Sequence, residues 1–304
     1  MTDASQQLFE ARHLPLRSQT KPEKRSIQSR IALIIFNKIK QMKTLVAAIA
    51  LSLGMGSGFS NIAFAESPKT APQELKDAIA GIEAAANDRD LDGVLDYYSE
   101  DFINTDGLNT ETLARGLEQM WNNYPNLKYT TEIQSWTEQE DKLVAETITT
   151  IEGVQRNKGR NIQLNSTVRS RQYFEDEQLV NQEILAEQSR LTSGKNPPQV
   201  EVIAPETIKT GEKYNFDLIV DEPLEDRVLL GAIKEEKTAS NLYLNSTALE
   251  LEPLPAGGIY KTSTAPLLPD SNWVSAILVR GDGITMITHR INIEEKPGDN
   301  PPKK

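Results

Sequence analysis

The sequence predicts an α+β protein whose second half is all β, and three observations indicate this. Apolar residues recur at helical spacing between residues 70 and 124. From residue 128 to residue 190, apolar and polar residues alternate, as in strands with one buried face. After residue 198 the helical spacing ends, and short strand-like segments recur between turns rich in Pro, Gly and Asp. We therefore expect three helices, then long antiparallel strands, and finally a β-sandwich.

The first 65 residues have the pattern of a secretory signal peptide. Basic residues, among them Lys38, Lys40 and Lys43, precede an apolar run over residues 44–55, and Ala63-Phe64-Ala65 forms a small-x-small cleavage site. The apolar run contains glycines and is shorter than the roughly 20 residues that a membrane span needs. We expect cleavage before Glu66 and no stable membrane anchor afterwards.

Two start sites and three locations fit this signal. Either Met1 or Met42 can begin the chain, and the second choice makes residues 1–41 an over-extended reading frame. The mature protein is expected to be exported, either to the periplasm or out of the cell. In a photosynthetic bacterium the compartment would be lumenal.

Charge and composition exclude several classes of function. The chain has 304 residues, no cysteine and two histidines, and residues 66–304 carry a net charge of −17. Nucleic acid binding needs clustered Lys and Arg, so no nucleic acid partner is expected. Thiolate sites, multi-histidine metal sites and a Ser-His-Asp triad are excluded or nearly so, and we expect no metal and no cofactor. His289, in a Thr-rich strand, is expected to be a surface or edge residue.

Three helices are predicted in the first half. One begins near Pro72, which suits the first turn of a helix, and the second covers residues 90–98. The third runs from Asn109 to a stop before Pro125. Each has one apolar stripe, formed in order by Leu75, Ile79, Ile82 and Ala86; by Leu91, Val94, Leu95 and Tyr98; and by Leu113, Leu117, Met120, Trp121 and Tyr124.

Strands and a linker complete the predicted organisation. The first domain, residues 66–193, adds strands at 129–136, 143–154, 162–174 and 179–190. Residues 194–198 have linker composition, residues 199–295 form the sandwich, and the charged, Pro-rich tail 296–304 is expected to be disordered. The expected sandwich strands are 200–203, 214–220, 227–234, 241–244, 248–251, 259–262, 273–280 and 285–293.

Residues 90–107, with the sequence DLDGVLDYYSEDFINTDG, resemble a helix-turn-strand region of the nuclear-transport-factor-two-like (SnoaL-like) superfamily. The resemblance covers about residues 70–192. It implies a cone-shaped domain in which three helices and a curved antiparallel sheet enclose a pocket. The second half resembles an immunoglobulin-like sandwich at the level of architecture.

Asp106 is the candidate catalytic residue. The resemblance to ketosteroid isomerases, a branch of that superfamily, implies that Asp106 is the general base. The same alignment places Ile82 where those enzymes have a hydrogen-bonding tyrosine, and isoleucine cannot stabilise a developing oxyanion. The alternative is that Asp106 belongs to an Asp-Gly turn near the pocket rim, where replacing it with Asn would cost about 1 kcal/mol or less.

Six further residues are candidate ligand-binding residues. Tyr98, Trp121, Tyr124 and Trp136 are aromatic residues of the first domain, some of which would line the pocket while others form the core. Arg169 and Arg171 share a strand face and are expected opposite Glu183 and Glu187. They would bind an acidic or polar ligand, or form a cross-strand ion-pair ladder on a solvated face.

The sequence favours an exported, non-catalytic accessory protein whose pocket binds a small apolar ligand or a protein partner. A second hypothesis is an isomerase, dehydratase or cyclase with Asp106 as base. A third is a structural module that forms a homodimer through the sheet of the first domain.

Overall fold

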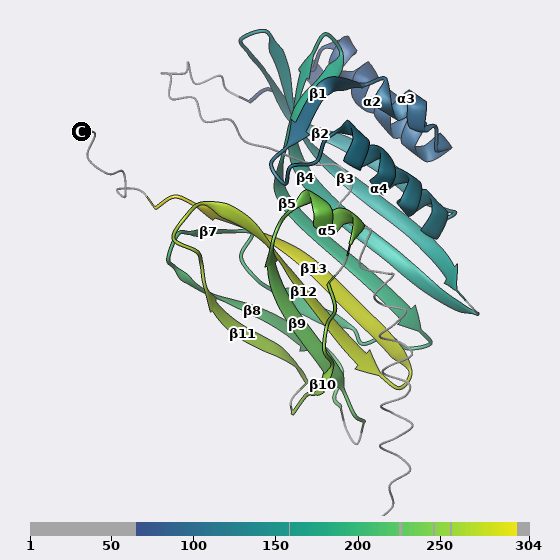
Figure 1. The fold of residues 1–304 in the computed structure, drawn as a ribbon, viewed down its shortest axis with the longest axis vertical. Helices are drawn as coiled ribbons and strands as arrows, with labels where there is room; N and C mark the ends of the chain where they lie inside the picture. The colour runs from purple at the N-terminus through teal and green to yellow at the C-terminus, as the bar shows by residue number, and fades with distance from the viewer. Residues whose placement is uncertain (1–64, 158, 225–226, 246, 256, 297–304) are drawn as a thin grey trace, which may run out of the picture. The chain divides into compact units, whose positions relative to one another are not determined.

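A ten-stranded sheet runs through the part of the chain that the structure describes. The computed structural model describes residues 65–157, 159–224, 227–245, 247–255 and 257–296, which belong to one compact unit (Figure 1). The main path of the sheet has the order β10-β9-β12-β13-β5-β4-β3-β2, with β1 added beside β5 and β7 beside β13. The predicted signal peptide, apart from Ala65, and residues 297–304 of the predicted tail lie outside the described residues.

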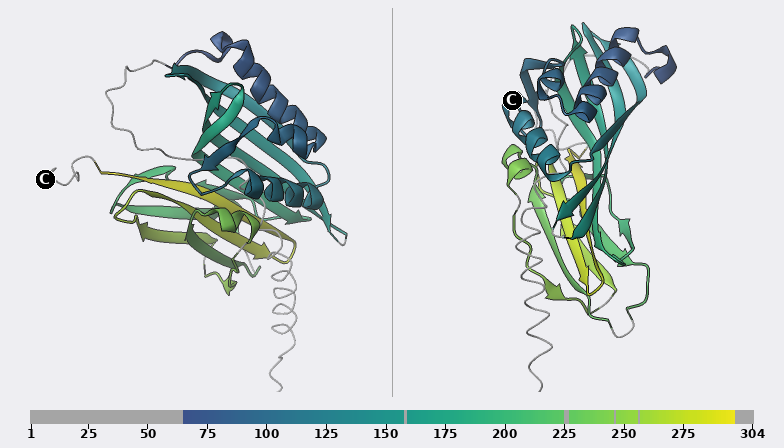
Figure 2. Two further views of the ribbon diagram at one scale, coloured as in Figure 1. Left: turned by 45° about the horizontal axis from the view of Figure 1, so that its top comes forward. Right: turned by 90° about the vertical axis from the view of Figure 1, so that its right-hand side faces the viewer.

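Three helices precede the long strands, as the apolar spacing predicts. They are α2 (Gln73–Asp88), α3 (Leu91–Leu95) and α4 (Thr110–Asn123), and a 3-10 turn, η2 (Pro68–Thr70), comes before them. The side chains of Asp90 and Asn109 cap α3 and α4 by accepting backbone N–H bonds. The helices α2 and α4 lie on one face of strands β2 to β5 (Figure 2). The buried stripes are Leu75, Ala78, Ile79, Ile82 and Ala86 on α2, and Leu113, Leu117, Met120 and Trp121 on α4.

The strands of the first half lie close to their predicted positions but are longer. They are β1 (Tyr98–Asn104), β2 (Lys128–Gln139), β3 (Lys142–Asn157), β4 (Arg160–Glu175) and β5 (Gln178–Gly194). The alternation of buried and less buried residues along β4 confirms the predicted two-faced strand. The buried side of β3, β4 and β5 faces the helices and is called the helix-covered face below.

The second half forms two packed layers. Its elements are β6 (Val200–Ile203), β7 (Thr207–Lys209), β8 (Lys213–Val220), β9 (Leu230–Lys237), α5 (Ser240–Leu244), β10 (Glu252–Pro253), β11 (Gly258–Thr264), β12 (Asp270–Arg280) and β13 (Gly283–Glu294). A three-stranded sheet, β11-β8-β6, is separate from the large sheet. Side chains of both layers meet in one apolar core, which includes Phe216, Leu218, Val274, Ala276, Leu278, Ile287 and Ile291.

The expected fold class, a three-helix cone domain followed by a sandwich, is wrong. Strands make up 55% and helices 19% of the described residues, which form four α-helices and large antiparallel sheets. The second predicted helix is a five-residue turn of helix, because the chain becomes strand β1 at Tyr98. Residues 241–244, expected as a strand, lie in α5. Most importantly, β5 continues to Gly194, where its second half pairs with β13, so that one sheet crosses the expected boundary.

The connection after β5 is held closely against the turn between β12 and β13. The backbone N–H groups of Lys195 and Asn196 donate to the carbonyl of Asp282 at 2.9 and 3.2 Å. Gly194 has φ +112°, and a Cβ added there would lie 2.4 Å from the Asp282 carbonyl oxygen. Only glycine suits this position, because the backbone conformation and the lack of space both exclude a side chain.

Gly194→Ala is therefore expected to lower the free energy of unfolding by about 2 kcal/mol, through strain and overpacking. Gly116→Ala is the matched control, since that glycine lies in α4 with nothing near its added Cβ. The control should raise stability by about 0.5–1 kcal/mol. Urea unfolding of both variants measures the difference, and equal stabilities would contradict the packing described here.

Candidate functional site

Asp106 lies in the turn between β1 and α4. This turn is closed by the Asn104 N–H, which donates to the Leu108 carbonyl at 2.8 Å, and by the Gly107 N–H, which donates to the Asn104 carbonyl at 2.9 Å. Gly107 has φ 77°, so the predicted Asp-Gly turn is confirmed. The expected position at an exposed rim is wrong, however, because Asp106 is only 6% exposed. The turn points its carboxylate into the protein.

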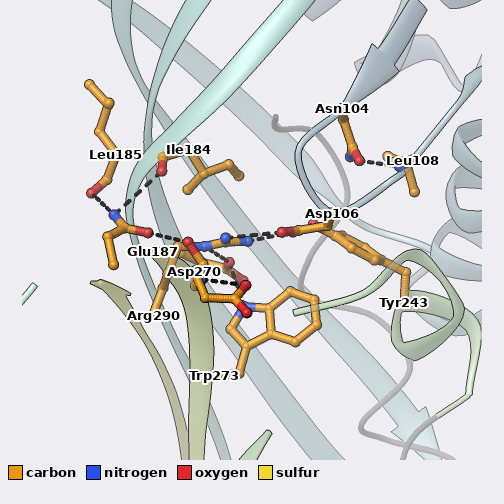
Figure 3. Close-up of polar contacts among 12 residues, drawn as sticks. Asn104, Asp106, Leu108, Ile184, Leu185, Glu187, Tyr243, Asp270, Trp273 and Arg290 are labelled. Atoms are coloured by element: carbon orange, nitrogen blue, oxygen red, sulfur yellow. Dashed lines mark hydrogen bonds and ion pairs between the residues drawn. The ribbon is translucent and has the colours of Figure 1, made fainter. Parts of the chain in front are cut away.

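The carboxylate of Asp106 is bound by a buried arginine from the far end of the sequence. Arg290 on β13 donates through Nη2 to Oδ2 at 2.7 Å and through Nη1 to Oδ1 at 3.3 Å (Figure 3). The hydroxyl of Tyr243, on α5, also donates to Oδ2. The side chains of Arg290 and Asp106 are both 1% exposed. This bidentate geometry matches two N–H groups of the planar guanidinium to the two oxygens of the carboxylate.

A second carboxylate binds the other edge of the same arginine. The Nε atom of Arg290 lies 3.2 Å from Oε2 of Glu187 on β5, and this oxygen also accepts the indole N–H of Trp273 at 2.9 Å. The guanidinium carbon lies 5.3 Å from the Trp273 ring centroid, and Tyr243 packs edge-on to that ring at 5.1 Å (Figure 3). We call Asp106, Glu187, Tyr243, Trp273 and Arg290 the Arg290 network.

The Arg290 network contains one guanidinium and two carboxyl groups in a buried site, where the side chains of Arg290, Asp106 and Glu187 are each 1% exposed. The carboxylates hold the pKa of Arg290 above its ordinary value, although burial lowers it. Burial raises the pKa of Glu187, and Arg290 offsets only part of that shift. Burial and the neighbouring Asp106 carboxylate raise the pKa of Tyr243. Glu187 Oε1 has no hydrogen-bond partner within the described residues, so this carboxyl group is the less well stabilised of the two.

The network joins parts of the sheet that are far apart in sequence. It connects the turn after β1 and strand β5 to α5, β12 and β13. Three donors occupy the oxygens of Asp106 and both side chains of its ion pair are enclosed, which leaves no approach for a substrate proton. This geometry suits a structural ion pair.

The predicted aromatic residues are dispersed. Tyr98, Trp121 and Tyr124 are buried beneath the helices, and the hydroxyls of the two tyrosines form no hydrogen bond within the described part of the chain. Trp136 lies on β2 and donates its indole N–H to Thr70 Oγ1 at 3.0 Å. None of these residues lines the pocket described below.

The two predicted arginines take part in different ion pairs. Arg171 is half-buried between Glu146 at 2.7 Å and Glu183 at 2.8 Å, across the neighbouring strands. Arg169 instead pairs with Glu206 at 3.0 Å. The expected common face of Glu183 and Glu187 does not occur, because the pairing of β4 and β5 shifts register after Arg169 and sends these glutamates to opposite faces.

A pocket of about 390 Å³ lies beside the first turn of α2 and the turns that connect β2 to β3 and β4 to β5. Its apolar lining is buried or half-buried and consists of Leu75, Ala78, Leu143 and Phe174. Its acidic lining is exposed and consists of Glu74, Asp141, Asp176 and Glu177. Sequence reasoning missed this site, although acidic residues at two predicted turns beside apolar strand ends are a signal for it.

The described residues contain neither a metal-binding cluster nor a membrane-spanning helix. No group of three or more His, Asp or Glu side chains is placed to hold a metal ion. No helix among these residues combines the length and apolar character needed to cross a membrane.

Comparison with known proteins gives one family match. The model of a domain of unknown function, DUF8623, matches residues 195–294, which comprise β6 to β13. No curated protein sequence matches the chain.

Two solved structures show weak similarity. The crystal structure of AclR from Streptomyces galilaeus is 20% identical with a TM-score of 0.28, and the match covers 38% of this chain and 76% of that one. Bd1075 from Bdellovibrio bacteriovorus is 16% identical with a TM-score of 0.28, over 37% of this chain and 39% of that one. Scores this low support no assignment of fold or function, and the resemblance of residues 90–107 to the SnoaL-like superfamily stays a prediction.

Proposed function

We propose that this is an exported, non-catalytic binding protein, in which the pocket beside α2 receives a small ligand or a side chain of a protein partner. The observation that carries the proposal is the pocket itself, an open space of about 390 Å³ with an apolar inner lining. Small-molecule sites are concave and usually measure about 300–1,000 Å³, and Leu75, Ala78, Leu143 and Phe174 supply the apolar part of this wall.

The state of Asp106 supports binding over catalysis. A general base must reach the proton that it removes and must have a free lone pair. In this protein Arg290 and Tyr243 already donate to both oxygens of Asp106, and the side chain is enclosed. The enzyme hypothesis therefore has no support from this residue.

Native mass spectrometry of the mature protein, purified from a host that exports it, tests the proposal. Wild-type protein should carry an additional small mass or a bound partner, and Leu143→Trp, which fills the pocket, should lose it. Leu268→Trp is the matched control, because Leu268 is 74% exposed and lies outside the pocket. Retention of the same mass by a folded Leu143→Trp variant would exclude the pocket. The same spectra show whether the predicted homodimer forms.

A further inference from the structure

Strand β11 has one open edge. It lies at the end of the three-stranded sheet, and β8 is its one partner strand within the described chain (Figure 1). Just after β11, the Ala265 N–H donates to the Glu212 carbonyl, so odd-numbered residues direct their backbone groups toward β8. Backbone groups alternate in direction along an antiparallel strand. The N–H and C=O groups of Tyr260 and Thr262 therefore point away from β8.

These outward groups are free to pair with another strand. Within the described residues, no other element bonds to the backbone of Tyr260 or Thr262. Tyr260 is 58% exposed, and Thr262 is exposed as well. A row of free main-chain donors and acceptors along a strand edge is a template for pairing with a further chain.

Two other edge strands are protected, whereas β11 is not. On β2, the Tyr129 backbone exchanges two hydrogen bonds with the Asn87 side chain, at 2.8 and 3.0 Å, and the Thr131 N–H donates to Glu83 at 2.6 Å. Strand β9 carries four consecutive charged residues, 234–237. Both devices oppose the addition of a strand. The exposed side chains of β11 are Tyr and Thr, which provide neither.

Apolar residues next to this edge are only partly covered. Ile233 on β9 and Leu254 after β10 pack against the core of the second half but are half-buried. Strands β9 and β11 are in contact, and Lys261 of β11 pairs with Glu235 of β9 at 2.7 Å. A strand added beyond β11 would therefore lie over the end of the large sheet, where apolar side chains on its inward face would cover Ile233 and Leu254.

The edge suits a short extended segment better than a second copy or the tail of this chain. The tail contains Pro297, Pro301 and Pro302, which lack the N–H donors of a strand. Stable pairs of globular chains usually bury about 1,200–2,000 Å², and one edge of seven residues offers little of that area. An extended peptide needs no larger surface, because main-chain hydrogen bonds supply its affinity.

We propose that β11 binds an extended segment of a partner protein, which adds a fourth strand to the three-stranded sheet. Alternate residues of that segment are apolar and face Ile233 and Leu254. The residues between them are polar and lie beside Tyr260 and Thr262. This surface is separate from the pocket beside α2 and goes beyond the proposed function.

A blocked peptide of alternating Thr and Val residues, with a lysine at each end for solubility, is the probe for the full mature chain. When it binds, the amides of Tyr260 and Thr262 should exchange with solvent about tenfold more slowly, because they gain carbonyl partners. The Lys261 amide, which already faces β8, is the internal control and should change little. Hydrogen exchange followed by NMR measures all three rates.

Two N-methylated forms of the probe separate main-chain pairing from general attraction to an acidic protein. One is methylated at every Thr nitrogen and the other at every Val nitrogen, so both keep the charge and the side chains of the probe. Only one set of N–H groups can face β11, because they alternate in direction. One form should therefore bind about tenfold more weakly than the other. Equal affinities of the two forms would overturn the proposal.

Thr262→Pro tests the same edge from the side of the protein. Proline is tolerated where the N–H of an edge strand faces solvent, and it removes a donor that the added strand needs. The variant should bind the probe about tenfold more weakly, whereas Thr262→Ala, which keeps the N–H, should bind it about as well as wild type. Fluorescence anisotropy of a labelled probe measures these affinities. The methylated probes use the wild-type chain, so the test does not depend on the folding of Thr262→Pro.

The remaining outcomes separate this surface from the pocket and from self-association. Leu143→Trp should leave binding of the probe unchanged, so the pocket and the edge can fail independently. A wild-type dimer in native mass spectrometry that Thr262→Pro dissociates, together with no binding of the probe, would assign the edge to a second copy and overturn the partner segment.

Discussion

Arg290→Met is expected to lower the free energy of unfolding by about 3–5 kcal/mol, because the change leaves two buried carboxylates without their cation. Methionine keeps most of the side-chain volume, so the loss reports the charge and its hydrogen bonds. The measurement is urea unfolding followed by tryptophan fluorescence, since Trp273 contacts the arginine. Failure of the variant to fold at all would agree with this expectation.

Arg169→Met is the matched control for that variant. Its ion pair with Glu206 is about half exposed, at 45% and 54% of the side chains. Exposed pairs contribute roughly 0–1 kcal/mol. Equal losses of stability in the Arg290 and Arg169 variants would contradict a structural role for the buried network.

Asp106→Asn should lower the free energy of unfolding by about 2–4 kcal/mol, because Arg290 loses a charged partner in a buried site. This loss is larger than the sequence context of Asp106 predicts.

Glu187→Gln is expected to flatten the pH dependence of stability above pH 4.5. Burial raises the pKa of Glu187 above its ordinary value of 4.5, so the folded protein binds this proton more tightly than the unfolded chain. The resulting contribution to stability is complete below pH 4.5 and is lost as pH rises through the folded pKa. As pH rises from 4.5 through the folded pKa of Glu187, wild-type protein should therefore lose stability relative to the Glu187→Gln variant.

Urea midpoints of the wild-type and Glu187→Gln proteins, measured at intervals between about pH 4 and 8, test this linkage. Glutamine retains an acceptor for the Trp273 indole, so the variant removes the titration and keeps the shape of the site. Glu183→Gln serves as a control, because Glu183 is half-buried beside Arg171 on the other face. Parallel pH profiles for wild type and Glu187→Gln would exclude a proton held by Glu187.

Local patterns predict the elements of this protein better than its architecture. The stripes of α2 and α4 and the alternation along β4 depend on neighbouring residues, and their predicted positions are confirmed. The pairing of β5 with β13 joins residues 89 to 101 positions apart, from Gly194 with Gly283 to Gln188 with His289. Nothing local to Gly194 distinguishes a linker from a strand end held by a distant turn. The fold class expected from the sequence is therefore wrong, although most of the individual helices and strands are predicted correctly.

In the candidate site too, local sequence predicts some features, while others depend on residues that are distant in sequence. Asp106 in a turn is a local property, and the Asp-Gly pair predicts it. Its burial depends on Arg290, which is 184 residues away along the chain. The face of Glu187 depends on a register shift that no residue type marks. His289, expected at the surface, is 6% exposed and bonds to the Pro205 carbonyl at 3.1 Å, because its strand is covered by the second layer.

The position of β5 also determines when the sheet can be completed during synthesis. Residues 188–194 pair on one side with β4 as soon as that hairpin forms, but their other side needs β13, which contains the last described strand residues, 283–294. Until those residues arrive, the backbone donors and acceptors on that side remain an open strand edge, which is a template for aggregation. A chain truncated before residue 283 would keep that edge permanently. For an exported protein, secretion of the whole chain before folding would avoid the problem, and loss of the last strand would yield an insoluble product even though the first half is complete.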